Sequence, residues 1–524
     1  MTPRHAAPAP PDRWDRSQHA VLSVSDLLCL DTTESPIPGA TITWEPHLAA
    51  MAALESGEVA NPDEGRRVGH YWLRAPEQAP SDSLRADIES TIVQTREIST
   101  RILASLQPQF VLHLGIGGSA LGPELLRDAL GGSAENGAIQ AAHYHVLDNV
   151  DPDGLANHLA RVDLSRTLVV VVSKSGGTAE VRQGLRVIAD AFKGAGLVLA
   201  AHAVAITGRD SLLDRKAQEE QWLARLPIWD FVGGRTSVTS PVGLFPLALL
   251  GGDLDAFLDG AAAMDVETRR SPSTNPAIWL AERWFEAQAD QPRAMVVLPY
   301  ADRLASLSRY LQQLVMESLG KRLDRSGGET RAALTVYGNK GSTDQHAYIQ
   351  QLRDGPDDFF AVFVEVVQTT AATGQAGDLL YSLLDGTRSA LYNDGKSCIT
   401  VQLPHLNART LGALIALFER AVGLYAEVLN INAYHQPGVE AGKQAAAATL
   451  EAQRLLLDAL SDLPLTTEAI CRIAGLDDAL TAWRLLCRLA HQGRGVERQR
   501  GDTPRNDQFF LRRAPGGDIS SNAT

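Results

Sequence analysis

The chain has 524 residues, of which 48 are Lys or Arg and 62 are Asp or Glu, so its formal net charge is −14. Hydrophobic residues make up 44% and charged residues 21%, a globular composition that excludes disorder throughout the chain. The negative charge argues against binding of nucleic acid or anionic membrane over the whole surface, but it allows a local pocket for a small anion. At about 150 residues per domain, the length suggests about three domains.

The N-terminus and the cysteines show no sign of secretion. Residues 1–20 are polar and Pro-rich and lack the apolar segment of a secretory signal. The four cysteines form no CxxC pair, so we expect neither a disulfide framework nor a zinc site. The longest apolar runs, such as Leu168–Val172, are far shorter than the ~20 residues of a membrane span. We therefore expect a cytoplasmic protein.

The first part of the chain alternates between helical and strand patterns. Residues 84–106 carry apolar side chains three or four positions apart, which predicts a helix. Short apolar runs at 110–114, 143–147, 168–172 and 199–206 predict strands, and a helix is expected at 179–192. Strands that alternate with helices indicate a doubly wound parallel sheet.

A second alternation follows the linker-like segment Arg269–Asn275. Strands are expected at 294–298, 359–366 and 397–402, and helices at 304–319, 411–429 and 439–457. The prediction is an α/β fold with two doubly wound parallel-sheet subdomains, an N-terminal helical arm and a small C-terminal α+β tail. We place the arm at 1–100, the subdomains at 101–268 and 269–445, and the C-terminal extension at 446–524.

The glycine-rich loop after the strand at 110–114 has three interpretations. Gly115 to Ala120 match the dinucleotide pattern G-x-G-x-x-A, but the candidate ribose acid Asp148 lies 28 residues beyond Ala120, later than the usual ~20. Alternatively, Gly118 lets the backbone approach another ligand and Ser119 adds a hydroxyl near a helix N-terminus. A tight turn without a ligand is the third interpretation.

The segment Ser173-Lys174-Ser175-Gly176-Gly177-Thr178 directly follows the most apolar predicted strand. Hydroxyls, an ammonium group and flexible glycines before a helix N-terminus are the groups that bind phosphate. No Walker A pattern is present. A structural turn rich in Ser and Gly is the alternative.

Single polar residues are less informative. Arg235 follows two glycines and could stabilise a developing negative oxygen, although one arginine is more often a surface charge. Gln313, Glu317 and Lys321 are spaced i, i+4 on one helix face, where an exposed Glu–Lys pair is the usual outcome. His346 and Lys443 lie in polar segments that, taken alone, are typical of surface loops.

Together, and in this order, these segments resemble the glucose-6-phosphate isomerase (phosphoglucose isomerase) family from about residue 110 to about 445. The matching motifs are GIGGSALGP, SKSGGT, GGRTS, Q-x-x-x-E-S-x-G-K and Q-x-G-V-E-x-G-K. The resemblance implies two sugar-isomerase (SIS-type) subdomains. It also implies an aldose–ketose isomerase of glycolysis and gluconeogenesis that interconverts glucose 6-phosphate and fructose 6-phosphate by ring opening and a cis-enediolate, without a metal or other cofactor.

The resemblance also implies roles for individual residues. Glu317 matches the catalytic base, Arg235 the group that stabilises the intermediate, and His346 and Lys443 the pair that opens and closes the ring. The matched phosphate-binding and sugar-contacting positions are Ser173, Lys174, Ser175, Thr178, Gly118, Ser119, Gln313 and Gln436. In the family the histidine comes from the neighbouring subunit, which implies a homodimer.

Some positions depart from the common family pattern. Gly176-Gly177 stand where a Thr-rich stretch is frequent, Pro437 where an aromatic residue often follows the glutamine, and Ser342–Asp344 replace a T-N-G-like run. These differences leave affinity and anomer preference open, more than the reaction itself.

Beyond residue 463 the isomerase pattern ends. Helices at 465–474 and 480–491 and strands at 496–500 and 509–513 give the outline of a small winged-helix module. Residues 484–513 hold eight Arg against three acids, a local charge of +5 that suggests nucleic acid. We expect instead an appended subdomain that packs on the dimer, and a salt-dependent gel shift would separate the two.

Two other functions remain open at this point. A nicotinamide-dependent dehydrogenase depends only on Gly115 to Ala120 and leaves Glu317, His346 and Lys443 without a purpose. A sugar-phosphate sensor without catalysis would bind without turnover, which the intact acid–base set argues against.

Overall fold

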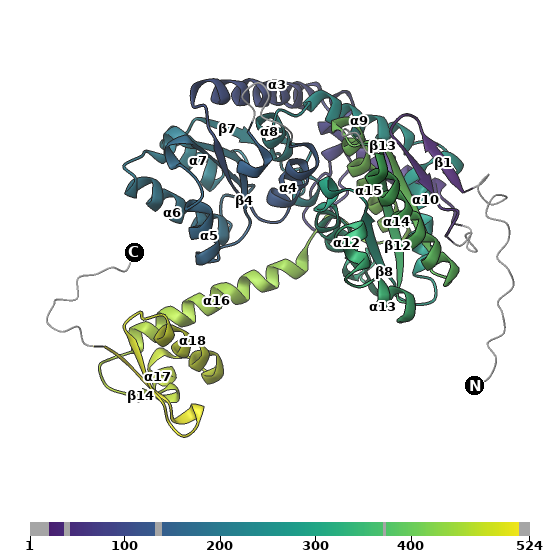
Figure 1. Ribbon diagram of the computed structural model, residues 1–524. Coiled ribbons are helices and arrows are strands. Elements are labelled where there is room, and N and C mark those ends of the chain that lie inside the picture. Colours follow the sequence, from purple (N-terminus) through teal and green to yellow (C-terminus); the bar gives the residue numbers. More distant parts are fainter. Residues whose placement is uncertain (1–19, 36–41, 132–138, 370–373, 513–524) are drawn as a thin grey trace, which may run out of the picture. The chain divides into compact units, whose positions relative to one another are not determined.

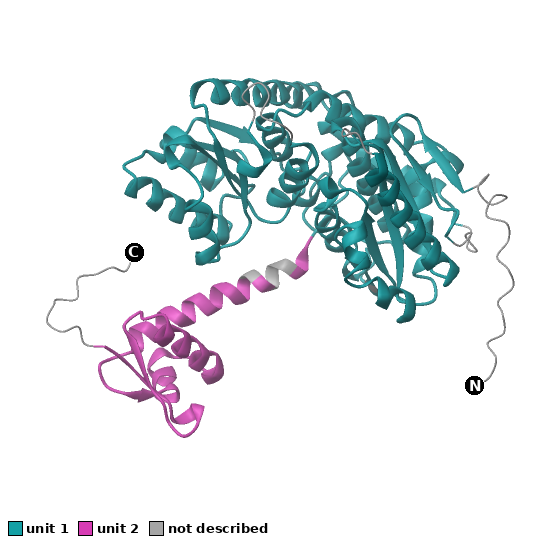
Figure 2. Cartoon of the chain, viewed as in Figure 1, with its two compact units in different colours: residues 1–435 teal, residues 436–524 magenta. Residues whose placement is uncertain are grey.

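The computed structural model describes residues 20–35, 42–131, 139–369 and 374–512 (Figure 1). The chain divides into two compact units, residues 1–435 and residues 436–524 (Figure 2). The first unit contains two open sheets with helices on both faces, which confirms the predicted α/β fold class. None of the helices in the described part of the chain combines the length and apolar character that a membrane span needs.

The first sheet has five parallel strands in the order β4-β3-β5-β6-β7. They are β3 (Phe110–Leu114), β4 (Tyr144–Leu147), β5 (Thr167–Ser173), β6 (Ala203–Thr207) and β7 (Ala224–Pro227). The helices are α3 (Asp82–Ser105), α4 (Gly118–Leu130), α5 (Pro152–Leu159), α6 (Ala179–Gly194), α7 (Leu212–Glu219) and α8 (Pro241–Leu249). The predicted strand at 199–206 is partly wrong, because Leu199–His202 form a 3-10 turn before β6.

The central strand β5 shows why this sheet is buried on both sides. Val170 and Val172 face a core that includes Phe245 of α8, whereas Val169 and Val171 face a core that includes Ile188 of α6. Because successive strand residues point to opposite faces, a strand covered on both sides needs a continuous apolar run.

The second sheet has six strands in the order β1-β2-β13-β12-β8-β11. Its parallel part consists of β8 (Ala294–Pro299), β11 (Val336–Tyr337), β12 (Phe359–Gln368) and β13 (Cys398–His405). The hairpin β1 (Val21–Val24) and β2 (Leu28–Asp31) extends it antiparallel to β13. No strand was predicted here, because two four-residue strands carry little periodicity.

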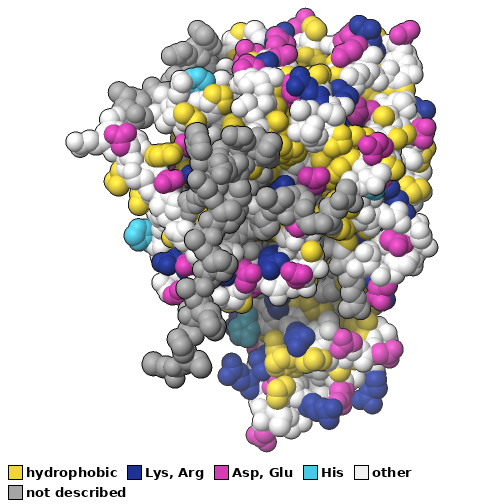
Figure 3. All heavy atoms as spheres, turned by 90° about the vertical axis from the view of Figure 1, so that its right-hand side faces the viewer, with side chains coloured by type: hydrophobic (Ala, Val, Ile, Leu, Met, Phe, Trp, Pro, Cys, Tyr) yellow, Lys and Arg dark blue, Asp and Glu magenta, His cyan; other side chains and the backbone are white. Residues whose placement is uncertain are grey.

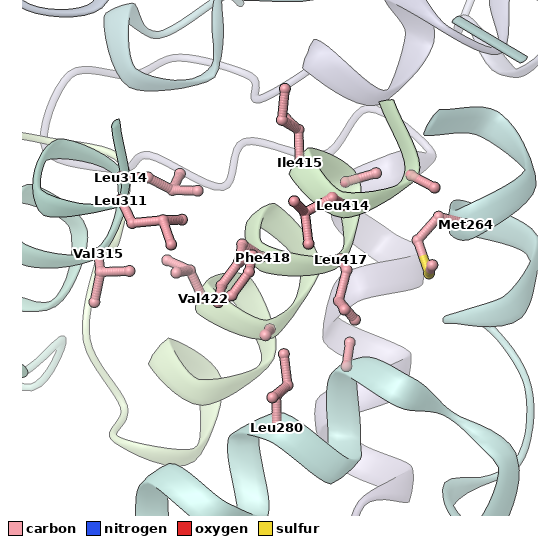
Figure 4. Close-up of a cluster of buried hydrophobic side chains, with 14 of the residues drawn as sticks. Met264, Leu280, Leu311, Leu314, Val315, Leu414, Ile415, Leu417, Phe418 and Val422 are labelled. Carbon is pink, nitrogen blue, oxygen red and sulfur yellow. The ribbon is translucent and has the colours of Figure 1, made fainter. Parts of the chain in front are cut away.

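Helices cover both faces of this sheet. One group consists of α2 (Glu45–Glu55), α9 (Leu254–Glu267), α10 (Pro276–Ala287) and α15 (Ala408–Val428), and the other of α12 (Gly341–Gln345), α13 (Ile349–Asp354) and α14 (Gly374–Asn393). Helix α15 is buried along most of its length and forms the centre of the largest core (Figure 4). Leu314 and Val315, three and two residues before the predicted base Glu317, belong to this core, so the site has a rigid support.

A charged network lies inside the same core. Asp265 of α9 accepts hydrogen bonds from Arg74 Nε and Nη2 at 2.7 and 2.8 Å and from Arg420 Nε at 2.9 Å. Burial alone would raise the pKa of Asp265, but Arg420 and Arg74 lower it to about 2. Arg74 also pairs with the buried Glu419, and Arg420 with Glu55. Removing any one of these charged groups would therefore leave an oppositely charged group buried without one of its partners.

We expect Asp265→Asn to lower the free energy of unfolding by about 3–5 kcal/mol, because it leaves buried guanidinium groups without their carboxylate. Denaturant unfolding at pH 7 measures the loss. Asp259→Asn, on the same helix but exposed, is the control and should cost less than about 1 kcal/mol. Since the pKa of Asp265 lies below its ordinary 3.8, its contribution should disappear as the pH falls from 3.8 towards 2. Equal losses in both variants would contradict the prediction.

The C-terminal unit contains the two predicted helices and the two predicted strands in order, but Leu465–Thr466, predicted as the start of the first helix, form a further strand. Its elements are α16 (Pro437–Ala459), β14 (Leu465–Thr466), α17 (Thr467–Ala474), α18 (Ala479–His491), β15 (Val496–Gln499) and β16 (Gln508–Leu511). The strands form an antiparallel sheet in the order β14-β16-β15. Thr466 caps α17 by accepting from the Ala469 N–H, and Gly475 ends it with a φ of 68°.

The charge of this unit is balanced. Residues 436–524 contain 11 Lys and Arg and 11 Asp and Glu, and Arg498 pairs with Asp507 at 2.6 Å. Side chains of both signs lie on the face of the molecule shown in Figure 3. The +5 stretch at 484–513 is thus offset within its own unit, and the role of the extension stays a prediction.

Candidate active site

Three of the predicted segments meet within the first unit. The loop after β3 turns into α4 at Gly117, whose φ of +58° favours glycine. A Cβ atom on Gly117 would lie 2.9 Å from Gln313 Nε2, and one on Gly118 would lie 1.8 Å from the carbonyl oxygen of Gly234. The backbone of the GIGG loop therefore packs directly against the Gln313 side chain and the GGRTS segment.

Glu317 lies at the point where these segments meet. Its Oε2 accepts a hydrogen bond from Gln313 Nε2 at 3.0 Å and lies 3.6 Å from Arg235 Nε. Its side chain is 19% exposed, so a ligand can reach it. The arrangement gives a carboxylate that is oriented by an amide and faces a fixed positive charge.

The helix that carries Glu317 is not regular. The helix predicted for 304–319 is confirmed for residues 307–319, but it is not a single α-helix: α11 spans Leu307–Leu311 and a π-helix, η10, follows at Gln312–Glu317. A π-helix contains an additional residue per turn, and such irregularities are frequent at functional sites. Gln313 and Glu317 remain hydrogen-bonded across this wider turn.

Arg235 is almost completely buried and extensively bonded. Its guanidinium donates to the carbonyl oxygens of Ala433 at 3.0 Å and His435 at 3.3 Å, and to Ser318 Oγ at 3.3 Å. Burial lowers the pKa of Arg235, and the nearby Glu317 opposes this. A guanidinium group nevertheless remains protonated in proteins, so Arg235 is a permanent charge beside the carboxylate.

The predicted phosphate loop follows β5 and leads into α6. Ser173 Oγ accepts from the Gly176 N–H at 3.1 Å, and Ser175 Oγ accepts from the Gly177 N–H at 3.1 Å. Thr178 precedes the 16-residue helix α6 without a side-chain cap, so the helix presents uncapped N–H groups. Uncapped N–H groups at a helix N-terminus attract anions.

Lys174 joins this loop to the segment before Arg235. Its Nζ donates to the carbonyl oxygens of Asp230 at 2.7 Å and Val232 at 3.0 Å. Burial and the nearby Arg66 lower the pKa of Lys174 to about 8, against the opposing effect of Asp230. Among the described residues of the loop, it provides the positive charge.

The remaining predicted residues lie elsewhere in the chain. Ser119 lies in the first turn of α4. His346 is exposed at the end of α12, and among the described residues no hydrogen bond or ion pair joins it to Glu317. Gln436 precedes α16 and belongs to the C-terminal unit. Lys443 lies on α16, and its side chain is outside the described residues.

Lys321 is a residue of the site that the sequence argument underrated. The expected alternative, an exposed ion pair with Glu317, is wrong, because Lys321 is 5% exposed and bonds the Glu317 backbone oxygen. The signals for it were its i, i+4 spacing from Glu317 and its place in the motif Q-x-x-x-E-S-x-G-K. The candidate ribose acid of the dinucleotide interpretation, Asp148, pairs with Arg309 at 3.2 Å.

Comparison with known proteins gives consistent matches. The phosphoglucose isomerase family model matches residues 47–385 and 381–455. A glucose-6-phosphate isomerase of Citrifermentans bemidjiense is 47% identical over 508 residues, which cover 92% of this chain and 95% of that protein. One from a Synechococcus species is 51% identical over 435 residues, covering 79% and 81%.

Two solved structures share the fold. The glucose-6-phosphate isomerase of Chlamydia trachomatis superposes with a TM-score of 0.74 at 26% identity, over 83% of this chain and 90% of that chain. A hypothetical protein of Thermus thermophilus superposes with a TM-score of 0.65 at 30% identity, over 81% of this chain and 99% of that chain. Both matches span most of the described chain.

Proposed function

Because the chain belongs to the phosphoglucose isomerase family and is an enzyme that interconverts glucose 6-phosphate and fructose 6-phosphate, we propose that Glu317 is its catalytic base. The observation that carries this proposal is the position of the Glu317 carboxylate, held by Gln313 and facing Arg235. A proton acceptor beside a permanent positive charge is what an enediolate mechanism requires.

The reaction moves one proton between adjacent carbons. Glu317 removes the proton from C2 of the open-chain aldose and returns it to C1, while the O2 hydroxyl proton passes to O1. A free carboxylate has a pKa of about 4.3 and is a weak base towards a C–H bond. The cis-enediolate therefore needs electrostatic stabilisation, which we assign to Arg235. Oxidation of C2 balances reduction of C1, so the step needs no external oxidant or reductant.

We assign phosphate binding to Ser173, Lys174, Ser175 and Thr178 together with the N-terminus of α6. The phosphate lies far from the reacting carbons, so its binding energy can hold the sugar chain in position for proton transfer. The proposed sugar contacts are Gly118, Ser119, Gln313 and Gln436.

The ring must open before the proton can move. We assign this step to His346, together with Lys443, because an imidazole can exchange protons near neutral pH. His346 is exposed, and among the described residues it forms no hydrogen bond or ion pair with Glu317. As the family resemblance implies, we propose a homodimer in which His346 completes the site of the partner.

We place the enzyme in the cytoplasm. Cys29, Cys398, Cys471 and Cys487 are free thiols, and free thiols persist in a reducing compartment. In this compartment the enzyme would act on the sugar phosphates of glycolysis and gluconeogenesis.

One coupled assay tests the proposed function. Purified protein supplied with fructose 6-phosphate should form glucose 6-phosphate, with no nicotinamide cofactor in the isomerisation step and with a chelator present. Binding of fructose 6-phosphate without turnover would favour a sensor and contradict the catalytic proposal.

We expect Lys174→Ala to raise KM about 10- to 100-fold and to leave kcat within about threefold, because a charged hydrogen bond contributes about 1.5–3 kcal/mol. In the wild type, KM should also rise as the pH increases through about 8, where Lys174 loses its proton. Initial rates over a range of substrate concentrations measure both effects. Lys193→Ala, at the exposed C-terminal end of α6, is the control. A collapse of kcat at unchanged KM would contradict the phosphate assignment.

A further inference from the structure

A buried lysine joins the base to a distant part of the chain. Lys321 is the first residue of β9 (Lys321–Leu323). Its Nζ donates to the carbonyl oxygen of Glu317 at 2.8 Å and to that of His435 at 2.8 Å. It is 5% exposed, so water contributes little to the position of these groups.

Arg235 holds the same segment from a second direction. It donates to the carbonyl oxygens of Ala433 and His435 and to the Ser318 hydroxyl. Two cations therefore bind the His435 carbonyl, and each also contacts Glu317 or its neighbour Ser318. Hydrogen bonds from charged donors are shorter and stronger than those between neutral groups.

The ammonium group is not held by an ion pair. Within the described ranges, no carboxylate oxygen lies within 4 Å of Lys321 Nζ. Burying an ammonium without a paired carboxylate costs free energy, which the two carbonyl contacts only partly offset. The charge is thus placed where it fixes backbone positions next to the carboxylate.

We infer that Lys321 is a positioning residue for proton transfer: it fixes the backbone at Glu317 and at His435, and so sets the distance between the base and the substrate carbons. This inference rests on the proposal that Glu317 is the base. Reacting groups must be placed closely, and a displacement of about 1 Å can cost about 10²-fold in rate.

The test replaces Lys321 with Met, which keeps the length of the side chain and removes the charge and donors. Lys321→Met should lower kcat about 10- to 100-fold and change KM by less than about threefold. Lys321→Arg should restore most of the rate, because a guanidinium can donate to two carbonyls. Lys396→Met is the matched control: Lys396 is also buried, at 7% exposure, but it pairs with Asp357 outside the site. Its kcat should equal that of the wild type.

The dependence of kcat on pH distinguishes a positioning role of Lys321 from a purely structural role. Burial and Arg235 lower the pKa of Lys321 to about 8, while Glu317 and Asp63 oppose this. His435 also faces it, with a pKa lowered by burial and by Lys321. Wild-type kcat at saturating substrate should fall as the pH rises through about 8, and Lys321→Arg should move this fall to higher pH. A purely structural role would change the melting temperature and leave the fall unchanged.

The outcomes for these variants distinguish failure of the positioning inference from failure of the base assignment. If Glu317→Gln is inactive while Lys321→Met has wild-type kcat per folded molecule, the positioning inference is wrong and the base assignment holds. If Glu317→Gln keeps its activity, the base assignment itself is wrong. Reduced kcat for Lys396→Met equal to that for Lys321→Met would also overturn the inference.

Discussion

Replacing Glu317 with Gln should remove nearly all turnover while the enzyme still binds sugar phosphate. The amide cannot accept the C2 proton, and general acid–base groups typically contribute about 10²- to 10⁴-fold to the rate. The side chain keeps its size, and its oxygen can still accept from Gln313 Nε2. We therefore expect kcat to fall by about that range and the dissociation constant for glucose 6-phosphate to change little, as measured by the coupled assay and by titration calorimetry.

The control for this substitution is Glu219→Gln on α7, which removes the same charge from an exposed position. It should have wild-type kcat. Turnover of Glu317→Gln within about tenfold of the wild type would be too high for a residue that carries the proton. Lost binding together with lost turnover would instead indicate that the site had collapsed.

The buried parallel strands are the part of the fold that the sequence predicts best. For β3, β5 and β8 the expected and observed bounds differ by at most one residue at either end. A strand covered on both faces is apolar at nearly every position, so its limits nearly coincide with the limits of the apolar run. The hairpin of β1 and β2 lacks this constraint, since half-buried strands of four residues leave no such run.

The site was predictable only in part, because its residues carry no local pattern comparable to the apolar run of a buried strand. Arg235, Gln313 and Glu317 lie far apart in the sequence, and none of them carries a local pattern that distinguishes it from a surface residue. Their order among the matched motifs indicated a site, and the packing of Gly117 and Gly118 shows how they meet. The π-helix had no signal, because it arises from how the chain packs and not from apolar spacing.

The last prediction concerns the origin of the histidine. His346→Ala and Glu317→Gln should each be nearly inactive as homodimers. If His346 acts in the partner's site, a mixed dimer contains one site in which both residues are intact. Random exchange of subunits makes half of the dimers mixed, with one working site in two, so refolding an equal mixture should restore about a quarter of wild-type activity.

Two controls show whether His346 acts in its own site or in the partner's site. Distinct affinity tags allow mixed dimers to be purified, and these should have about half of wild-type activity per dimer. Dimers of wild type with a chain that carries both substitutions should be nearly inactive, because each site then lacks one of the two residues. If His346 served its own subunit, the results would be reversed. The mixed dimer of His346→Ala with Glu317→Gln would be inactive, and the dimer of wild type with the doubly substituted chain would be half-active. We expect the first outcome, because the family resemblance implies a histidine from the neighbouring subunit and His346 is exposed.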